Sequence, residues 1–200
     1  MLNKTYDVVI TGAGPAGCAC ALALHGSGLR VVMVEKDIFP RDKICGDAIP
    51  GLAFKAMDKI NTEWGNAMRQ FIDKEAVRTA KIFAPNNKII TLDWITFAYN
   101  SKRINFDHFL FQLVKNETTT TIFENKRLQK VVVEKDGVEC QFQENLVINA
   151  AIIIGCDGAN SMVMRQLGSV DLQNSPSCAA VRTYYKGIEE LKTGVNEFHF

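Results

Sequence analysis

The sequence predicts an α/β fold that begins with a βαβ unit, continues through a small antiparallel meander and contains the start of a mixed α+β domain. Three observations carry this prediction. A glycine-rich turn separates a short apolar strand from an Ala- and Leu-rich helix, and a second apolar strand follows within about 30 residues. Several short strand patterns then surround a turn at Asp136 and Gly137. The crossover of the βαβ unit is expected to be right-handed.

The composition is typical of a globular protein with one sizeable core and the beginning of a second. The chain has 200 residues, of which 47% are hydrophobic, and its 23 Lys and Arg against 22 Asp and Glu give a formal net charge of +1. It contains no basic block, so nucleic acid is not an expected partner. It shows no signal-peptide pattern, and its apolar stretches fall short of the ~20 residues that cross a membrane. We therefore expect a cytoplasmic protein.

The cysteines do not follow the spacing of a metal site. None forms a C-x-x-C pair or lies beside clustered histidines, and this disfavours zinc or another bound metal. Thiols stay free in a reducing cytosol, so we expect most of these residues to be small buried hydrophobes. They are Cys18, Cys20, Cys45, Cys140, Cys156 and Cys178.

The first strand is expected at residues 6–11, where YDVVIT is short and apolar. A helix follows from Pro15 to about His25, because proline suits a first helical position, where its missing N–H has no partner anyway. GSG at 26–28 ends this helix. The run LRVVMVEK at 29–36 is then a strand of the continuous apolar kind found in parallel sheets.

The turn between this strand and helix fits the pattern G-x-G-x-x-G. Its first glycine permits the tight turn, its second lets the backbone approach a pyrophosphate, and its third lets the helix pack on the strand. The N–H groups and dipole at the start of the helix favour an anion. The candidate residues are Gly12, Gly14, Pro15, Ala16 and Gly17.

Glu35, followed by Lys36, ends the second strand where a ribose-binding carboxylate belongs, about 20 residues after the glycines. Pattern, context and acid together predict a Rossmann-like domain that binds an adenine dinucleotide. The pattern does not decide between NAD and FAD. The alternative interpretation is a glycine-rich turn beside a surface glutamate.

The middle of the chain carries weaker patterns. AFKAMDKI at 53–60 has helical spacing, and KIFAPNNKIITLDWI at 81–95 indicates two strands around a Pro-Asn-Asn turn. Residues 105–114 are predicted to form an amphipathic helix with Asn105 as its N-cap. Its apolar residues are Phe106, Phe109, Leu110, Leu113 and Val114.

Short strand patterns and one short helix follow. The strands are expected at 120–123, 127–135, 138–142 and 146–155, which together form a meander that returns to a buried strand. A turn then leads into a helix that Asn160 or Ser161 caps and Gly168 ends.

Four stretches in order resemble a known group of proteins: GAGPAGCACALAL with VVMVEK, FPRDKICGDAIP, RINFDHFLFQLV and IIIGCDGANSMVMRQLG. They resemble FAD-dependent oxidoreductases with the p-hydroxybenzoate hydroxylase type of fold and, within them, the geranylgeranyl reductase family. The stretches span nearly the whole chain. The resemblance implies FAD as the cofactor, with its ADP part at Gly12, Gly14, Gly17 and Glu35.

The resemblance also implies that Arg103, Asp157 and Gly158 lie near the FAD pyrophosphate. The Asp-Gly motif has been linked to a pyridine nucleotide as well. Each position also has an ordinary interpretation. Arg103 is then a solvated residue at a helix start, and Asp157 caps the turn into its helix, because Asp suits such turns for local reasons.

The loop that holds Lys43, Cys45 and Gly46 resembles the family's K-x-C-G pattern, which runs past the flavin towards the substrate pocket. Near a flavin, Lys43 stabilises an anionic reduced ring and Gly46 permits close backbone approach. Cys45 is a catalytic candidate if flanking cations lower its pKa. The alternatives are that Cys45 only packs and that Arg41 and Lys43 are solvated loop charges. Asp47 stands where many relatives have a small or uncharged residue, although it belongs, with Lys36, Arg41, Cys45 and Gly46, to the residues expected to contact FAD.

The resemblance implies two domains. The FAD-binding domain is expected at 1–49 and 101–175, and a partial substrate domain at 50–100 and 176–200. The family's third FAD motif, a Gly-Asp element, is absent from these residues, so we expect the chain to be incomplete.

By this resemblance we expect an FAD-dependent oxidoreductase that passes a hydride to a carbon–carbon double bond of an apolar substrate, with NAD(P)H as the electron donor. A monooxygenase or halogenase on the same fold is the nearest alternative, and a non-catalytic dinucleotide-binding module is another. Peripheral membrane association stays open for a lipid-like substrate, and the sequence predicts no oligomeric state.

Overall fold

The structure is a computed structural model that describes residues 6–168, 178–189 and 191–200. Its contacts divide the chain into two compact units. Unit 1 comprises residues 1–41 and 107–178, and unit 2 comprises residues 42–106 and 179–200. The identification of these units as an FAD-binding domain and part of a substrate domain stays a prediction.

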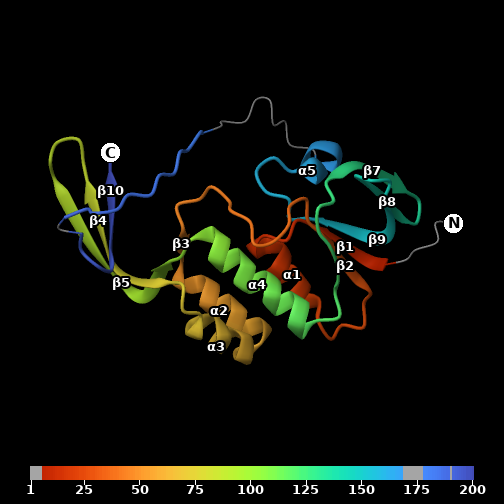
Figure 1. Ribbon diagram of the computed structural model, residues 1–200, viewed down its shortest axis with the longest axis horizontal. Coiled ribbons are helices and arrows are strands. Elements are labelled where there is room, and N and C mark those ends of the chain that lie inside the picture. Colours follow the sequence, from red (N-terminus) through yellow and green to blue (C-terminus); the bar gives the residue numbers. More distant parts are fainter. Residues whose placement is uncertain (1–5, 169–177, 190) are drawn as a thin grey trace. The chain divides into compact units, whose positions relative to one another are not determined.

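Unit 1 contains a six-stranded sheet in the order β6-β2-β1-β9-β8-β7 (Figure 1). Its strands are β1 (Tyr6–Thr11), β2 (Val31–Val34), β6 (Thr121–Phe123), β7 (Leu128–Glu134), β8 (Gly137–Phe142) and β9 (Val147–Gly155). Its helices are α1 (Pro15–Leu24), most of α4 (Arg103–Glu117) and α5 (Met162–Leu167). The neighbouring strands β6, β2, β1 and β9 are parallel, while β7 and β8 form an antiparallel hairpin. The α/β fold and the βαβ unit are therefore confirmed. The meander is confirmed for β7, β8 and β9, but β6 was wrongly assigned to it, because β6 pairs parallel with β2.

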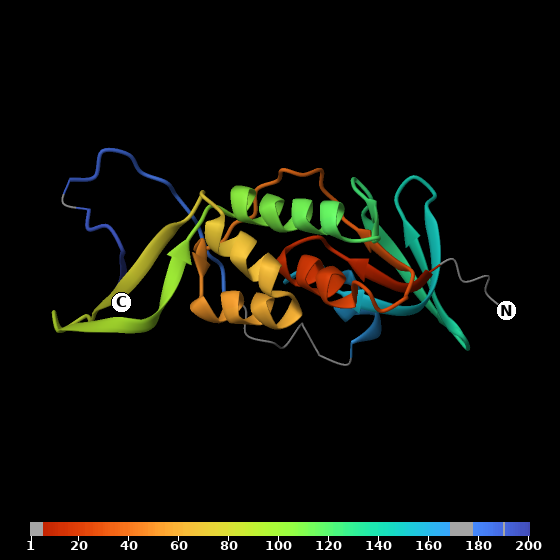
Figure 2. The same cartoon turned by 90° about the horizontal axis from the view of Figure 1, so that it is seen from below.

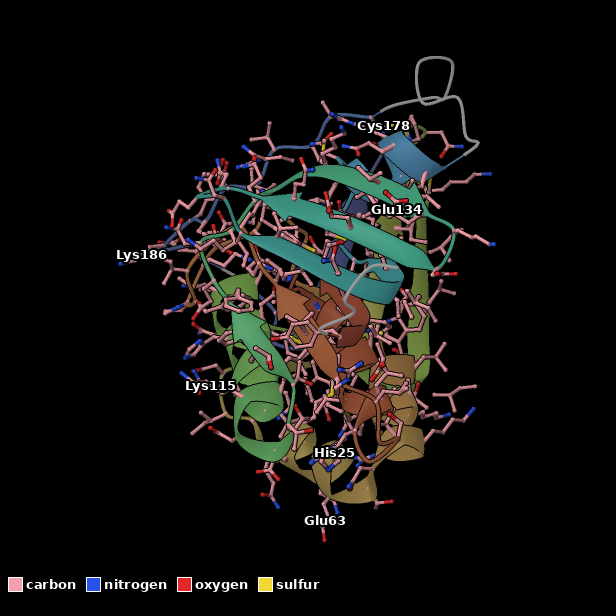
Figure 3. All side chains as sticks on the ribbon, turned by 90° about the vertical axis from the view of Figure 1, so that its right-hand side faces the viewer. His25, Glu63, Lys115, Glu134, Cys178 and Lys186 are labelled. Atoms are coloured by element: carbon pink, nitrogen blue, oxygen red, sulfur yellow. The ribbon has the colours of Figure 1, made fainter. Side chains whose placement is uncertain are left out.

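The core of unit 1 forms where β1 lies between two parallel neighbours. Val8 pairs with Val31 on one side and with Ile152 on the other. All four residues of β2 are buried, which explains its continuous apolar run, since a strand covered on both faces needs no polar alternation. The predicted turn at Asp136 and Gly137 joins β7 to β8, and Glu134 lies at the end of β7 (Figure 3).

Unit 2 contains a four-stranded sheet in the order β10-β4-β5-β3. Its elements are β3 (Ala48–Ile49), α2 (Gly51–Ile60), α3 (Thr62–Gln70), β4 (Glu75–Phe83), β5 (Ile89–Asn100) and β10 (Val195–His199). Helices α2 and α3 pack side by side (Figure 2, orange and gold). The predicted helix at 53–60 and the two strands around the Pro-Asn-Asn turn are confirmed, whereas α3, β3 and β10 were not predicted.

Helix α4 differs from its predicted form at its start and on its buried face. It begins at Arg103, where the Lys102 carbonyl already accepts the N–H groups of Asn105 and Phe106, so Asn105 is not the N-cap. The predicted apolar face is also wrong in part, because Phe109 and Leu113 are only half-buried. The fully buried residues are Phe106, Asp107, Leu110, Phe111 and Val114. The buried face therefore includes a charged residue.

Candidate dinucleotide site in unit 1

The glycine turn after β1 is too tightly packed to accept side chains at two of its positions. Gly12 has a φ of +92°, and a Cβ there would lie 2.4 Å from the Cys156 carbonyl oxygen. A Cβ on Gly17 would lie 1.8 Å from the carbonyl oxygen of Gly12. Real atoms do not approach this closely, so both positions require glycine for the turn to close and for α1 to pack against it.

Gly14 is different, because its missing side chain leaves open space. Among the residues that the structure describes, a Cβ there would meet one heavy atom within 4 Å outside its chain neighbours, Nη2 of Arg41 at 3.4 Å. Gly14 is also the N-cap of α1, and Pro15 occupies the first turn. The first N–H groups of a helix have no partner within it and carry its positive dipole end. A guanidinium and a helix N-terminus thus lie beside a position without a side chain, which fits the pyrophosphate of a dinucleotide.

Glu35 lies against this turn, as the sequence predicts for the acid of a dinucleotide site. Its Oε2 accepts a hydrogen bond from the Ala13 N–H at 2.7 Å, and its Oε1 accepts one from the Asp37 N–H at 3.1 Å. The residue is only 3% exposed. The Lys36 side chain, by contrast, is half exposed, and its Nζ lies 3.9 Å from Asp37 Oδ2. The carboxylate of Glu35 is thus fixed by backbone donors, and its contact with a ribose stays a prediction.

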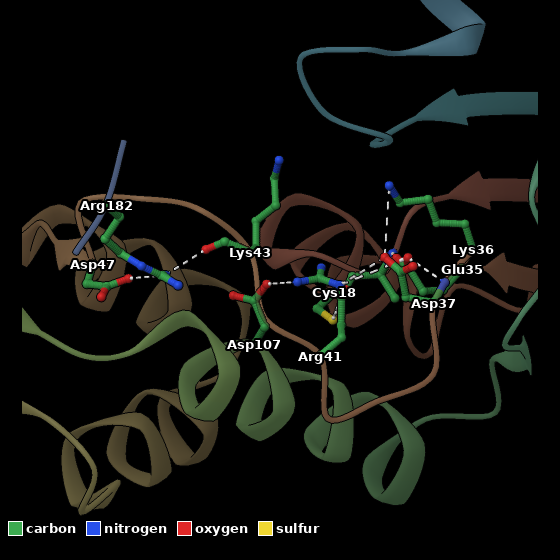
Figure 4. Close-up of polar contacts among 10 residues, drawn as sticks. Cys18, Glu35, Lys36, Asp37, Arg41, Lys43, Asp47, Asp107 and Arg182 are labelled. Atoms are coloured by element: carbon green, nitrogen blue, oxygen red, sulfur yellow. Dashed lines mark hydrogen bonds and ion pairs between the residues drawn. The ribbon is translucent and has the colours of Figure 1, made fainter. Parts of the chain in front are cut away.

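Arg41 connects Glu35 to Asp107, a second buried acid on α4 (Figure 4). Arg41 Nη1 donates to Asp107 Oδ2 at 2.8 Å, and Arg41 Nε lies 4.0 Å from Glu35 Oε1. The guanidinium also lies 4.8 Å from the centre of the Phe39 ring, which stacks on Phe111 at 4.3 Å. Arg41 is therefore no solvated loop charge, since its side chain is only 11% exposed.

Sequence reasoning missed Asp107. Its side chain is completely buried, on the same face of α4 as Leu110, Phe111 and Val114. The i, i+3, i+4, i+7 spacing of these four residues was the available signal, because a carboxylate on the apolar stripe of a helix needs a buried partner. That partner, Arg41, is distant in the sequence.

The predicted Asp-Gly turn lies next to the glycine turn. The Cys156 N–H donates to the Thr11 carbonyl at 2.8 Å, and Asp157 Cα would be 3.1 Å from a Cβ on Gly12. The Asp157 carboxylate accepts from Ser161 Oγ at 2.5 Å and from the Met162 N–H at 2.6 Å. Asp157 therefore caps the start of α5, together with the N-cap Ser161, and its contact with a cofactor stays a prediction.

Gly158 and Gly168 occupy the two ends of this turn and helix. Gly158 has a φ of +82°, which glycine adopts without strain, and a Cβ on it would meet no atom of the described residues within 4 Å. Gly168 is the C-cap of α5, so the predicted end of that helix is confirmed.

The cysteines are less buried than predicted. Only Cys18 and Cys140 are fully buried, while Cys20, Cys45 and Cys156 are half-buried and Cys178 is exposed. Cys20 lies within α1, and Cys45 and Cys156 lie in loops outside the helices and strands. Burial raises the pKa of Cys18 and, to about 11, that of Cys156, so these two thiols beside the glycine turn are protonated at neutral pH.

The remaining predicted site residues belong to unit 2, so their approach to the glycine turn stays a prediction. Lys43 and Gly46 are exposed, Cys45 and Asp47 are half-buried, and Arg103 is half-buried at the start of α4. Sequence reasoning also missed two residues that contact this loop. Arg182 donates to the Lys43 carbonyl, and Tyr184 donates to the carboxylate of Asp47.

Comparison with known proteins gives a family, two relatives and a shared fold. The family model described as "FAD dependent oxidoreductase" matches residues 7–166. The chain is 28% identical over 185 residues to digeranylgeranylglycerophospholipid reductase 1 of Methanococcoides burtonii, covering 88% of this chain and 43% of that protein. It is 28% identical over 210 residues to conditioned medium factor receptor 1 of Dictyostelium discoideum, covering 92% of this chain and 39% of that protein.

A solved structure of the halogenase PltM in complex with phloroglucinol and FAD shares the fold. Its TM-score is 0.72 at 19% identity, over 82% of this chain and 37% of that chain. The chain therefore spans about two fifths of the length of these proteins. Within the described residues, no helix has both the length and the hydropathy needed to cross a membrane.

Proposed function

The chain belongs to the FAD-dependent oxidoreductase family, and from this premise we propose that unit 1 binds the ADP part of FAD at the Gly12–Gly17 turn. The observation that carries this proposal is the open space at Gly14 between the start of α1 and the Arg41 guanidinium. Both groups are positive and face the place where the second glycine of such a turn lets a pyrophosphate approach.

Each residue around the turn has a proposed role in holding the cofactor. The N–H groups at the start of α1 and the guanidinium of Arg41 bind the pyrophosphate, and Glu35 accepts from a ribose hydroxyl. Asp107 orients Arg41 through their 2.8 Å hydrogen bond. The Asp157-Gly158 turn adds backbone next to the same site. FAD supplies hydride transfer when it is bound, and the protein supplies orientation and electrostatics.

We propose further that the protein is a reductase of carbon–carbon double bonds in apolar substrates, with NAD(P)H as the electron donor. The similarity to a digeranylgeranylglycerophospholipid reductase supports this reaction. In unit 2, β5 exposes apolar side chains, which supports an apolar, prenyl-like substrate. They are Ile89, Ile90, Leu92, Trp94, Ile95 and Phe97.

In this proposal the loop with Lys43, Cys45 and Gly46 lines the flavin ring and the substrate. Lys43 offsets negative charge on the reduced ring. Gly46 permits close approach, because a Cβ there would meet nothing within 4 Å in the part of the chain that the structure describes. Cys45 lies nearest the reacting bond. We also propose a cytoplasmic enzyme that contacts membranes only at their surface, to reach lipid-like molecules.

Two alternatives remain. A halogenase shares this fold, so a monooxygenase or halogenase is the second candidate. The similarity to a receptor in Dictyostelium favours a third candidate, a dinucleotide-binding module without catalysis. Anaerobic reduction of a prenyl substrate by the flavin-loaded protein supports the reductase. Oxygen consumption with an aromatic substrate supports the second candidate.

Titration with FAD tests the shared premise. The purified chain is expected to quench flavin fluorescence and to shift the visible flavin absorption as it binds. Gly14→Ala should weaken binding by about tenfold, because its methyl group occupies the space proposed for the pyrophosphate. Arg30→Ala is the control, since Arg30 pairs with Asp7 at the surface. If the chain gives no flavin signal at all, the proposed site is wrong.

A further inference from the structure

Arg182 contacts three groups of one loop in unit 2, the loop from Asp42 to Asp47. Figure 4 shows two of these contacts, those with Lys43 and Asp47. Its Nη1 donates to the Lys43 carbonyl at 3.1 Å and lies 3.5 Å from Asp47 Oδ1, and its Nη2 donates to the Asp42 carboxylate. A guanidinium offers several donors in a fixed plane, so one side chain holds the loop at both of its ends.

Tyr184, two residues later, holds the same loop from a second direction. Its hydroxyl donates to Asp47 Oδ2 at 2.5 Å. Its ring lies 4.7 Å from the Arg182 guanidinium carbon and 5.1 Å from Lys102 Nζ, so a cation-π contact joins the two holding residues. Both Asp47 oxygens are thus engaged by the segment 182–184.

Asp47 needs this support because its backbone is in the left-handed region, with a φ of 60°. Aspartate tolerates this conformation better than most residues, yet a cost remains for any side chain with a Cβ. The Ser101 N–H donates to the Asp47 carbonyl at 2.9 Å, which fixes the backbone directly before β3. The end of the loop is therefore held through its carbonyl and through both carboxylate oxygens.

The middle of the loop is left exposed between these held ends. Ile44 is 64% exposed, Lys43 and Gly46 are exposed, and Cys45 is half-buried. The middle of the loop thus presents an apolar side chain, a thiol and, at Gly46, backbone without a side chain.

We propose that Arg182 and Tyr184 are positioning residues, which hold the Asp42–Asp47 loop in the conformation that presents Cys45 and Gly46 to the flavin and its substrate. The proposal rests on the proposed function for the identity of what the loop meets. Its physical part, the clamp on the loop, stands on contacts within unit 2 alone.

The clamp differs from an ordinary surface ion pair. Isolated exposed pairs contribute little, because water competes with them and the side chains lose entropy on pairing. Here one guanidinium serves three acceptors on one loop, and its side chain is 15% exposed against 12% for Asp47. Networks with fixed Arg geometry are the case in which such contacts do restrict motion.

Amide hydrogen exchange on the purified chain tests the clamp. Arg182→Ala should raise exchange within residues 42–47 by about tenfold, and Tyr184→Phe should raise it less, at the Asp47 end. Arg182→Lys should restore part of the protection, because it keeps the charge but not the planar fork. Tyr185→Phe is the matched control, since Tyr185 is the adjacent tyrosine and is 75% exposed.

Alkylation of Cys45, normalised to the exposed Cys178, gives an independent readout and should accelerate in the same variants. The clamp is overturned if amide exchange within residues 42–47 is as slow in Arg182→Ala as in the wild type. An equal rise across β4 and β5 overturns it as well, because Arg182 would then stabilise the whole unit rather than the loop.

Flavin absorption separates the clamp from the proposed function. With FAD bound, Arg182→Ala and Tyr184→Phe should change the shape of the visible flavin band, while Tyr185→Phe should not. A chain that binds no FAD but shows the predicted exchange refutes the proposed function and leaves the clamp in place. A variant that loosens the loop without changing the flavin band overturns the positioning role.

Discussion

The two halves of the segment from Phe39 to Asp47 are held in different ways. In unit 1, Arg41 pairs with Asp107, which is completely buried. In unit 2, Arg182 pairs with the carboxylates of Asp42 and Asp47, and the side chain of Asp42 is 51% exposed. Removing one partner of a buried pair leaves an uncompensated charge, whereas water replaces an exposed contact. The first half is therefore fixed by the fold itself, and the second is held by contacts that can open while the fold stays intact.

The largest expected effect tests the buried half. Asp107→Ala should lower the free energy of unfolding by about 3 to 5 kcal/mol, because the buried Arg41 guanidinium loses its hydrogen-bonded counter-ion and keeps the more distant carboxylates of Glu35 and Asp37, at 4.0 Å. Urea denaturation measures this loss. The double variant Arg41→Met with Asp107→Leu should regain most of the stability but not FAD binding. A loss below about 1 kcal/mol in Asp107→Ala, the size seen for surface pairs, would remove the contrast between the two halves.

A smaller loss of stability is expected inside the glycine turn, where one glycine is needed for packing and another is proposed to serve FAD binding. Gly17→Ala should destabilise the chain by about 1 to 3 kcal/mol or more, because its Cβ would lie 1.8 Å from a carbonyl oxygen. Gly14→Ala should leave the midpoint of unfolding nearly unchanged and weaken FAD instead. Equal losses of stability in the two variants would show that Gly14 serves the fold.

The smallest effect is a pH dependence in the exposed half. The hydrogen bond to Asp47 raises the pKa of Tyr184, and the hydrogen bond from Arg182 lowers the pKa of Asp42. The tyrosine contribution is complete below the ordinary tyrosine pKa and is lost as the pH rises through the raised value. The Asp42 contribution is complete above the ordinary aspartate pKa and is lost as the pH falls through the lowered value. The loop should therefore stay held across the neutral range and loosen in alkali.

Ultraviolet titration of the tyrosines measures the alkaline side. Besides Asp47, the charged groups around Tyr184 are Arg182, Asp42 and Lys102. A last ionisation step should appear in the wild type and in Tyr185→Phe, and should be missing in Tyr184→Phe. If the step persists in Tyr184→Phe, Tyr184 does not donate to Asp47 in solution.

The parts of the fold that sequence predicted correctly are those in which cause and effect are close in the chain. The Gly12–Gly17 turn, its helix and the strand before Glu35 form a local unit, and the atom that requires glycine at Gly17 is the Gly12 carbonyl oxygen of the same turn. The hairpin at Asp136 and Gly137 is local as well. Helix α3 is an instructive exception. Asn61 caps it by accepting from the Glu63 N–H at 2.7 Å. This N-cap was a local signal that sequence reasoning missed, and the helix contains Gly65, a residue that disfavours helices.

The parts that were missed depend on contacts between distant residues. The burial of Asp107 is explained by its hydrogen bond with Arg41. The position of Arg182 is explained by its contacts with the Asp42–Asp47 loop. The spacing on α4 indicates that Asp107 needs a buried partner, but neither segment indicates which residue that partner is. The face of α4 was misassigned for the same reason, because a carboxylate counts as polar until its buried partner is known.

The place of β1 in the sheet has a consequence for synthesis on the ribosome. Strand β1 pairs with β2 on one side, a neighbour made soon after it, and with β9 on the other. The whole of α2, α3, β4 and β5 is made before β9 emerges. Until then the nascent βαβ unit exposes one edge of an apolar strand, the kind of edge that pairs with other chains. The strand order of the sheet thus sets how long the unpaired edge of β1 in the nascent chain must be kept from pairing with other chains.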